Sequence, residues 1–220
     1  MATPRTVSRA RRRQRREESR RQIVEAAEAF LRERPYRELT VDELMAATGF
    51  TRTLFYRHFD DLPALVMEVL EEVGTGLVGA TREMTAAGGD PERLRHGLRE
   101  VVSFFAANGP VVRAVAEAAS YDDRIEAVYD GVLERFVALT ESTFADLRAA
   151  GEIAELDPRA TAQALTALNE RYLLATLGRT PRADPEAVFD ALWTIWRRTL
   201  FLDAAEPAAA RPSRRRPRQA

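Results

Sequence analysis

Residues 40–59, TVDELMAATGFTRTLFYRHF, contain the signals for two short helices joined by a tight turn. Thr40 can cap the first helix, and Glu43 stands three residues later, at the spacing of a capping box. Gly49 can adopt the left-handed conformation that ends a helix. Thr51 can then cap the second helix. The stretch therefore predicts a helix-turn-helix unit.

The second of these helices has an apolar side and a basic side. Phe50 and Phe55 are spaced as a hydrophobic staple, and Phe55 shares an inward face with Phe59. The opposite side presents arginine, hydroxyl and aromatic groups: Arg52, Thr53, Leu54, Tyr56, Arg57 and His58. Arginine can bind guanine through two hydrogen bonds, and hydroxyl groups can bind phosphate. The pattern favours a helix in the major groove of DNA over a helical hairpin with a solvated face.

Residues 23–72 resemble the first four helices of the TetR family of transcriptional regulators. The resemblance is carried by the motifs T-V-D-E-L, A-x-x-G and F-Y-x-x-F in their order along the chain. It implies DNA contacts from one set of side chains: Thr40, Thr51, Arg52, Thr53, Tyr56 and Arg57. Leu54 is a further candidate, because it lies on the same outward arc of the helix. Two positions depart from the family pattern. Leu54 stands where many members have threonine, and Leu62 follows two aspartates where many members have a phosphate-binding lysine.

Composition narrows the class of protein further. The chain has 220 residues, enough for one or two domains with a buried core. It has no cysteine, which excludes disulfides and thiolate sites. No apolar run is long enough to span a bilayer, so we expect a cytoplasmic protein. The two histidines, His58 and His96, stand apart, and no phosphate-binding loop is present. We therefore expect no catalytic site, metal or cofactor.

Positive charge is concentrated at both ends of the chain, although the overall net charge is −1. Residues 1–22 contain nine arginines and two glutamates, and residues 207–220 contain five arginines. We expect a disordered arginine-rich arm over residues 1–20 and a disordered basic tail over residues 205–220. The arm has two interpretations. In the first, it lies along DNA phosphates or in the minor groove. In the second, it is a solvated tail without a role in binding.

The remaining sequence predicts an all-α fold of about nine helices, with no convincing strand pattern. We expect a three-helix helix-turn-helix domain over residues 21–66 and a ligand-binding and dimerisation domain over residues 67–204. Glycine, proline and Asp-Pro signals place the later helices: Leu62 to about Ala86, ending at Gly88-Gly89; from Asp90-Pro91 to a break at Asn108-Gly109-Pro110; a short helix from Val111 to Ala119; from Asp122 or Asp123 to near Gly151; from Asp157-Pro158 to Leu177; and from Asp184-Pro185 to about Leu202.

The last two helices are apolar over more of their circumference than one core face requires. The family resemblance implies that they pair with a second copy as a four-helix homodimer interface. The alternative is that they only close the core of the monomer.

Residues 164–178, ALTALNERYLLATLG, and residues 189–201, FDALWTIWRRTLF, resemble the subgroup of the family that contains the mycobacterial repressor of ethionamide activation. That resemblance implies an aromatic tunnel in which Asn169 anchors an apolar ligand and Trp196 lines the wall. Helical phase adds further candidates: Phe104, Phe105, Phe136, Thr140, Phe144, Thr166 and Trp193. The alternative is that Asn169 bonds another protein group and that the aromatic residues only pack the core.

These features predict a regulator that binds an operator in double-stranded DNA and responds to a small hydrophobic effector. Repression, relieved by the effector, is the mode that the resemblance implies. The alternative is a DNA-binding protein of the same fold without an inducer, acting architecturally or through its abundance.

Overall fold

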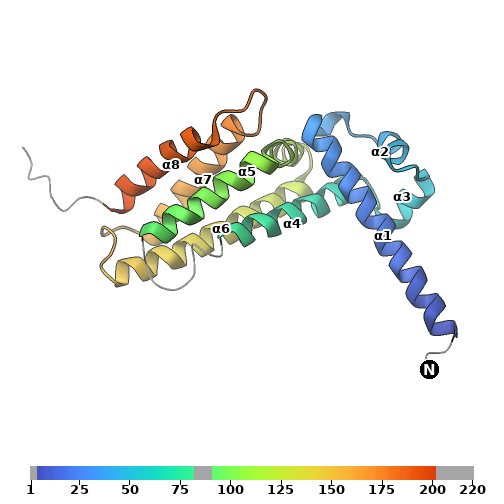
Figure 1. The fold of residues 1–220 in the computed structure, drawn as a ribbon, viewed down its shortest axis with the longest axis horizontal. Helices are drawn as coiled ribbons and strands as arrows, with labels where there is room; N and C mark the ends of the chain where they lie inside the picture. The colour runs from blue at the N-terminus through green and yellow to red at the C-terminus, as the bar shows by residue number, and fades with distance from the viewer. Residues whose placement is uncertain (1–3, 82–90, 202–220) are drawn as a thin grey trace, which may run out of the picture.

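The computed structural model describes residues 4–81 and 91–201, and all regular structure in these ranges is helical (Figure 1). The elements are α1 (Pro4–Glu33), the 3-10 turn η1 (Tyr36–Glu38), α2 (Val41–Thr48), α3 (Arg52–His58), α4 (Leu62–Thr81), α5 (Pro91–Ala119), α6 (Asp123–Ala149), α7 (Pro158–Thr176) and α8 (Pro185–Leu200). The all-α prediction is confirmed. The described residues form eight α-helices instead of about nine, because two predicted helices are one.

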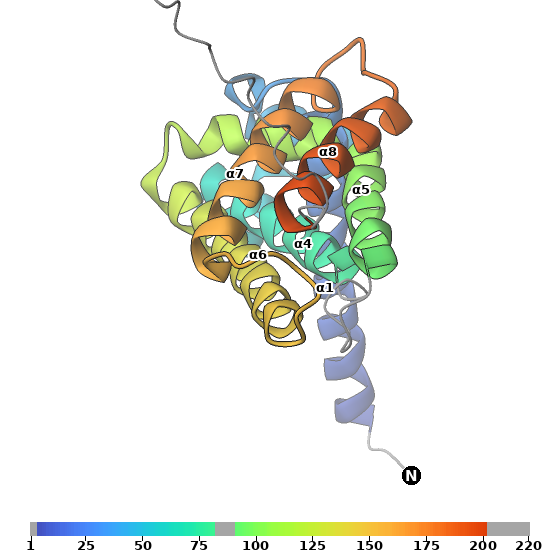
Figure 2. The same cartoon turned by 90° about the vertical axis from the view of Figure 1, so that its left-hand side faces the viewer.

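The helices enclose two apolar cores that share α4. The first core contains residues of α1, α2 and α3 with the start of α4, and the second lies among α4, α5, α6, α7 and α8. Figure 1 shows α2 and α3 at one end of the molecule and α7 and α8 at the other. In Figure 2, α7 and α8 lie nearest the viewer, and α4 lies behind them. Leu65 and Val69 of α4 belong to the first core and Leu77 to the second, so α4 connects the two.

The last turns of α5 also belong to the first core. Val111, Ala114, Val115 and Ala118 are buried there, together with residues of α1 and α2. The helix-turn-helix unit is therefore closed in part by a helix that lies beyond α4 in the chain.

The predicted break at residues 108–110 is wrong, because α5 continues through Pro110 to Ala119. Proline has no N–H to donate to the carbonyl of Ala106, which would leave that oxygen without its helical partner. The Arg182 guanidinium donates to this oxygen at 2.7 Å. Arg32 of α1 donates to the neighbouring carbonyl of Ala107. Side chains from outside the helix thus supply donors where the proline interrupts the ladder.

Gly109 is needed for a close approach between helices and not for a turn. A Cβ atom at this position would lie 2.6 Å from the carbonyl oxygen of Leu177. A Cβ atom at Gly178 would lie 3.2 Å from the carbonyl oxygen of Gly109. Because neither position has a side chain, α5 and the end of α7 pack backbone against backbone.

The prediction that residues 1–20 are disordered is wrong for residues 4–20, which are part of α1. Ion pairs one helical turn apart support this segment. Arg13 pairs with Glu17 at 2.7 Å, and Arg21 pairs with Glu18 at 2.9 Å. Oppositely charged side chains at this spacing stabilise a helix modestly. The acidic residues that interrupt the arginine run therefore favour helix over coil.

Other predicted boundaries fall near or outside the described residues. Helix α8 ends at Leu200, two residues before the predicted end. The predicted end of the fourth helix at Ala86, the Gly88-Gly89 stop and the basic tail at 205–220 lie outside the described residues. None of the helices that the structure describes is long and apolar enough to cross a membrane.

Candidate nucleic-acid interface and apolar cavity

The local signals read from residues 40–59 form the expected helix-turn-helix. The Thr40 hydroxyl accepts a hydrogen bond from the backbone N–H of Glu43 at 3.2 Å and donates to the Glu43 carboxylate at 2.9 Å. Gly49 ends α2 with a φ of 71°, in the left-handed region. Thr51 caps α3 by accepting from the N–H of Leu54 at 3.3 Å. These caps fix the angle at which α3 leaves the turn.

Helix α3 buries one side and exposes the other. Phe55 and Phe59 are buried in the first core, with ring centroids 5.6 Å apart. Most of the predicted DNA-contact residues lie on the exposed side: Thr40, Thr51, Arg52, Thr53, Tyr56 and Arg57. Tyr56 is 51% exposed, whereas large aromatic side chains are usually more buried. Leu54 is half-buried, so it lies at the edge of this surface.

The two arginines of this surface are in different states. Arg52 binds both carboxylate oxygens of Asp42 on α2, at 2.9 and 2.8 Å, and lies beside Tyr56. The Arg57 guanidinium has no partner among the described residues and is exposed. Arg57 is therefore ready to bind an anionic group, whereas Arg52 must exchange or share its carboxylate partner to do so.

The carboxylates at the start of α4 are partly neutralised by the protein itself. Asp61 accepts from the backbone N–H of Ala64 at 2.8 Å and pairs with Arg124 of α6 at 3.0 Å. Leu62 is half-buried and supplies no charge at this position. The expected phosphate-binding lysine is thus replaced by the uncharged Leu62, next to an aspartate that is already paired with Arg124.

Helix α1 contacts the end of the recognition helix. The Ser19 hydroxyl lies 2.9 Å from Nε2 of His58, and the Arg16 guanidinium lies 3.5 Å from the carbonyl oxygen of Arg57. Arg20 lies over the Phe59 ring, 4.8 Å from its centroid, and pairs with Glu68 of α4. These contacts fix the direction of α1, whose earlier turns project beyond α3 in Figure 1. Arg11 to Glu18 are exposed along that projecting part.

His58 is the titratable group in this contact. Burial of its imidazole lowers its pKa below the ordinary value of 6.5. The positive charges of Arg16, Arg20 and Arg57 act in the same direction. The folded protein therefore favours neutral His58. Its contribution to stability is complete above pH 6.5 and is lost as the pH falls from 6.5 through the lowered folded-state pKa.

We expect the stability advantage of the wild-type protein over His58→Gln to shrink as the pH falls below 6.5. Glutamine does not titrate, so titrations elsewhere cancel in the comparison. Free energies of unfolding of both proteins, measured across this pH range, test the expectation. A difference that is constant with pH, or that grows on acidification, would contradict it.

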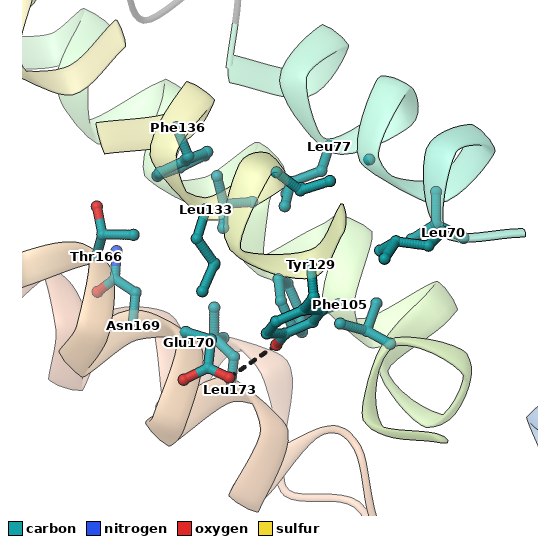
Figure 3. A pocket seen from close by; sticks show the side chains of 15 residues that line it. Leu70, Leu77, Phe105, Tyr129, Leu133, Phe136, Thr166, Asn169, Glu170 and Leu173 are labelled. Atoms are coloured by element: carbon teal, nitrogen blue, oxygen red, sulfur yellow. Dashed lines mark hydrogen bonds between the residues drawn. The ribbon is translucent and has the colours of Figure 1, made fainter. Parts of the chain in front are cut away.

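A small apolar cavity lies among α4, α5, α6 and α7 (Figure 3). Its volume is about 40 Å³, room for roughly two or three water molecules. Its lining residues come from four helices: Leu70, Val73, Gly74, Leu77, Val101, Phe105, Val112, Tyr129, Val132, Leu133, Phe136, Thr166, Asn169, Glu170 and Leu173. In this conformation the cavity is far smaller than a typical ligand site of roughly 300–1,000 Å³.

The polar groups of the cavity are gathered on α7 and α6. The Oγ1 atom of Thr166 and the Nδ2 atom of Asn169 are buried without a hydrogen-bond partner. The Asn169 side-chain oxygen accepts from Nε1 of Trp196 at 3.2 Å. Figure 3 shows the remaining pair, in which the Tyr129 hydroxyl donates to Glu170 at 2.7 Å. Burial, with the Glu170 charge beside it, raises the pKa of Tyr129.

The predicted ligand residues divide into two groups. Phe105, Phe136, Thr166 and Asn169 line the cavity. The others are not among its lining residues: Phe104, Thr140, Phe144, Trp193 and Trp196. Phe144 packs edge-on against Trp196 with centroids 5.7 Å apart, and the Thr140 hydroxyl donates to the carbonyl of Phe136. The core-packing alternative thus describes these side chains in the observed conformation.

Sequence reasoning missed Tyr129 and Glu170 as cavity residues. Glu170 is the second letter of the N-E-R segment, so its proximity to Asn169 was available as a signal. Tyr129 lies on the apolar side of α6, where nothing in the sequence distinguishes a cavity residue from a core residue. Among the described residues, no group of three or more His, Asp or Glu side chains could hold a metal.

Comparisons with known proteins agree with this arrangement. The family model described as "Bacterial regulatory proteins, tetR family" matches residues 23–69. The model described as "Transcriptional regulator EthR, C-terminal domain" matches residues 94–201. The chain therefore belongs to the TetR family of helix-turn-helix, DNA-binding transcriptional regulators.

Within that family, the chain is similar to the HTH-type transcriptional regulator EthR of Mycolicibacterium smegmatis. The two are 25% identical over 186 residues, covering 81% of this chain and 84% of the relative. The fold resembles that of the fatty acid degradation regulator FadR from Bacillus halodurans, with a TM-score of 0.70, 18% identity, and 80% and 93% of the two chains covered. It also resembles AibR, solved in complex with isovaleryl coenzyme A and operator DNA, with a TM-score of 0.65, 20% identity, and 80% and 96% covered.

Proposed function

We propose that this protein is a cytoplasmic, dimeric repressor that leaves its operator when a small apolar molecule enters the cavity. The observation that carries the proposal is the position of α4. Its first turns pack in the core that holds Phe55 and Phe59 of α3, and Leu70, Val73 and Leu77 farther along line the cavity. A molecule that displaces α4 therefore changes the position of the recognition helix.

The small cavity volume suggests how a ligand would act. A molecule larger than a few atoms fits only if the helices around the cavity move apart. Such a ligand binds the expanded conformation more tightly, and it shifts the population by that difference in affinity. Repression is lost if, in the expanded conformation, the distance between the two recognition helices of the dimer no longer matches the spacing of the two half-sites.

The outer faces of α7 and α8 support pairing with a second copy. The exposed residues of α7 include Ala164, Ala167 and Ala175, which allow close approach of another helix. Ile195 of α8 is 40% exposed, which leaves apolar surface on that helix too. A single helix-turn-helix reads only one half-site, so pairing is needed for an operator of full length. Sedimentation equilibrium that gives a monomer would contradict this part of the proposal.

The residues that we propose to contact DNA are exposed on α3 or beside it: Thr40, Thr51, Arg52, Thr53, Tyr56 and Arg57, with Leu54 at the edge. Arg57 is proposed to bind a base edge or a phosphate, because its guanidinium is exposed and unpaired among the described residues. The arginines of the projecting part of α1 are proposed to bind phosphates alongside.

A second candidate function is a DNA-binding protein of this fold that responds to no ligand. The small volume of the cavity favours it. Fluorescence anisotropy with DNA from upstream of the protein's own gene distinguishes the two. We expect specific binding that a panel of apolar compounds reverses. Specific binding that no compound changes would support the second candidate, and binding without sequence preference would contradict both.

We expect Thr166→Val to stabilise the ligand-free protein by roughly 1 kcal/mol, because it removes a buried hydroxyl without a partner and keeps the side-chain shape. Thr140→Val is the matched control. The Thr140 hydroxyl is also buried but donates to the carbonyl of Phe136 at 2.9 Å, so its loss should destabilise by about 0.5–1.5 kcal/mol. Thermal unfolding followed by circular dichroism measures both. Shifts of the same sign in the two variants would contradict the assignment of Thr166 as an unsatisfied cavity group.

A further inference from the structure

A second recess lies at the junction between the two cores. It is bounded by the end of α1 with η1, by the Pro110 segment of α5 and by the loop between α7 and α8. Figure 1 shows that loop beside the upper end of α1. The recess has a volume of about 390 Å³, within the range of small-molecule sites of roughly 300–1,000 Å³. It is about ten times larger than the apolar cavity.

Arginine dominates the lining of this recess. Five arginines line it, Arg32, Arg34, Arg37, Arg113 and Arg179, against two glutamates, Glu33 and Glu117. Part of this charge is already balanced. Arg37 pairs with Glu117 at 2.6 Å, and Arg34 pairs with both Glu43 at 2.7 Å and Glu38 at 3.0 Å. Arg32 pairs with Glu28. With these pairs counted, two arginines of the recess remain without a carboxylate partner, beside the exposed carboxylate of Glu33.

Arg113 and Arg179 are the two arginines of the recess that remain available to a ligand. Neither forms an ion pair or a side-chain hydrogen bond with any residue that the structure describes. They come from different segments held together by the glycine contact between α5 and the end of α7. A Cβ atom at Gly178 would lie 3.2 Å from the Cβ atom of Arg113, and Arg179 is the next residue. Arg113 is half-buried, so solvent screens its charge less than that of an exposed arginine.

We propose that this recess binds a small, multiply charged anion carrying a diphosphate group. Arginine forks match phosphate oxygens with paired, charge-assisted hydrogen bonds, and two unpaired arginines supply two such forks. A recess of this size admits a small molecule, whereas the backbone of a DNA duplex requires an outward-facing surface. The anion contacts α1 and η1 on one side and α5 and the α7–α8 loop on the other. Its binding stabilises the observed arrangement of the two cores, at a site separate from the apolar cavity.

Isothermal titration of the full-length protein with inorganic pyrophosphate at low ionic strength tests the proposal. We expect saturable binding of one pyrophosphate per chain and a raised melting temperature. Arg179→Gln should weaken binding by about tenfold, because it removes one charge-assisted contact. Arg135→Gln removes an exposed arginine on α6 that pairs with Glu71 and lies outside the recess, so it should leave pyrophosphate affinity unchanged. Arg113→Gln should resemble Arg179→Gln, and the exposed Arg179 carries the test if the half-buried Arg113 variant folds poorly.

Two results would overturn the proposal. One is equal pyrophosphate affinity in Arg179→Gln and Arg135→Gln, which would mean diffuse attraction to a basic surface. The other is absence of saturable pyrophosphate binding. If Arg179→Gln then also weakens operator binding, the arginines are assigned to the DNA backbone. The titration requires neither operator nor apolar ligand, so its outcome is independent of the proposed repressor function.

Discussion

Gly109→Ala should lower the free energy of unfolding by about 2 kcal/mol or more, although alanine is the better helix former. The added Cβ atom would lie 2.6 Å from the carbonyl oxygen of Leu177 and 2.9 Å from its carbonyl carbon. Both atoms are backbone, so no side-chain rotation relieves the overlap. Overpacking costs typically about 1–3 kcal/mol, and here α5 and α7 must separate to accommodate it. Urea denaturation followed by circular dichroism measures the change.

Gly131→Ala is the matched control for this prediction. Gly131 lies in the middle of α6, is exposed, and has no neighbouring atom within 4 Å of an added Cβ. The same substitution should therefore stabilise by about 0.5–1 kcal/mol through helix propensity alone. If Gly109→Ala were as stable as Gly131→Ala, the backbone-to-backbone contact between α5 and α7 would not exist in solution.

Removing positive charge from the projecting part of α1 should reduce the affinity for DNA more than any single substitution on α3. Replacing Arg11, Arg12, Arg13 and Arg15 with glutamine removes four exposed positive charges and retains helix-forming residues. If each arginine binds one phosphate, the slope of log affinity against log salt should become less steep by about three to four. The affinity at low ionic strength should fall by about a hundredfold or more. Fluorescence anisotropy across a salt series measures both quantities.

The contacts of Arg16, Ser19 and Arg20 are left intact by this design, so the docking of α1 on α3 and α4 is preserved. Arg135→Gln again serves as the control, because it lowers the net charge at a site far from α3 along the chain and should not change the salt slope. An unchanged slope in the quadruple variant would show that the segment is a solvated helix without a role in DNA binding.

The part of the molecule that sequence reasoning described best is the helix-turn-helix. Its signals are local: Thr40 and Thr51 are caps, Gly49 is a left-handed stop, and Phe55 and Phe59 share one face. Each acts within a few residues, so tertiary contacts were not needed to interpret them. The same local reasoning failed at Asn108-Gly109-Pro110, because the donor that replaces the missing N–H comes from Arg182, 76 residues beyond the accepting Ala106.

The arm was mispredicted for a related reason. Its arginine content suggested a disordered chain, but the pairs with Glu17 and Glu18 and the contact between Ser19 and His58 stabilise a helix. The cavity was predicted only in part. Helical phase identifies which side of α6 or α7 faces inward, and Phe136 and Thr166, chosen in this way, lie beside the cavity. Asn169, which the family resemblance indicated, lies there too. Helical phase does not show how far along the helix the neighbouring elements separate, so Phe144 and Trp196 could not be told from lining residues.

The contribution of α5 to the first core sets a limit on recombining parts of this protein. Val111, Val115 and Ala118 are buried against the helix-turn-helix, although they lie more than 40 residues beyond its last helix in the chain. A fragment cut after residue 66 would expose the surface that these residues cover. Transplanting the DNA specificity of this chain onto another regulator thus requires the matching face of α5 to be carried along. For a chimera, the natural unit of exchange is a surface contributed by two distant segments and not a continuous stretch of sequence.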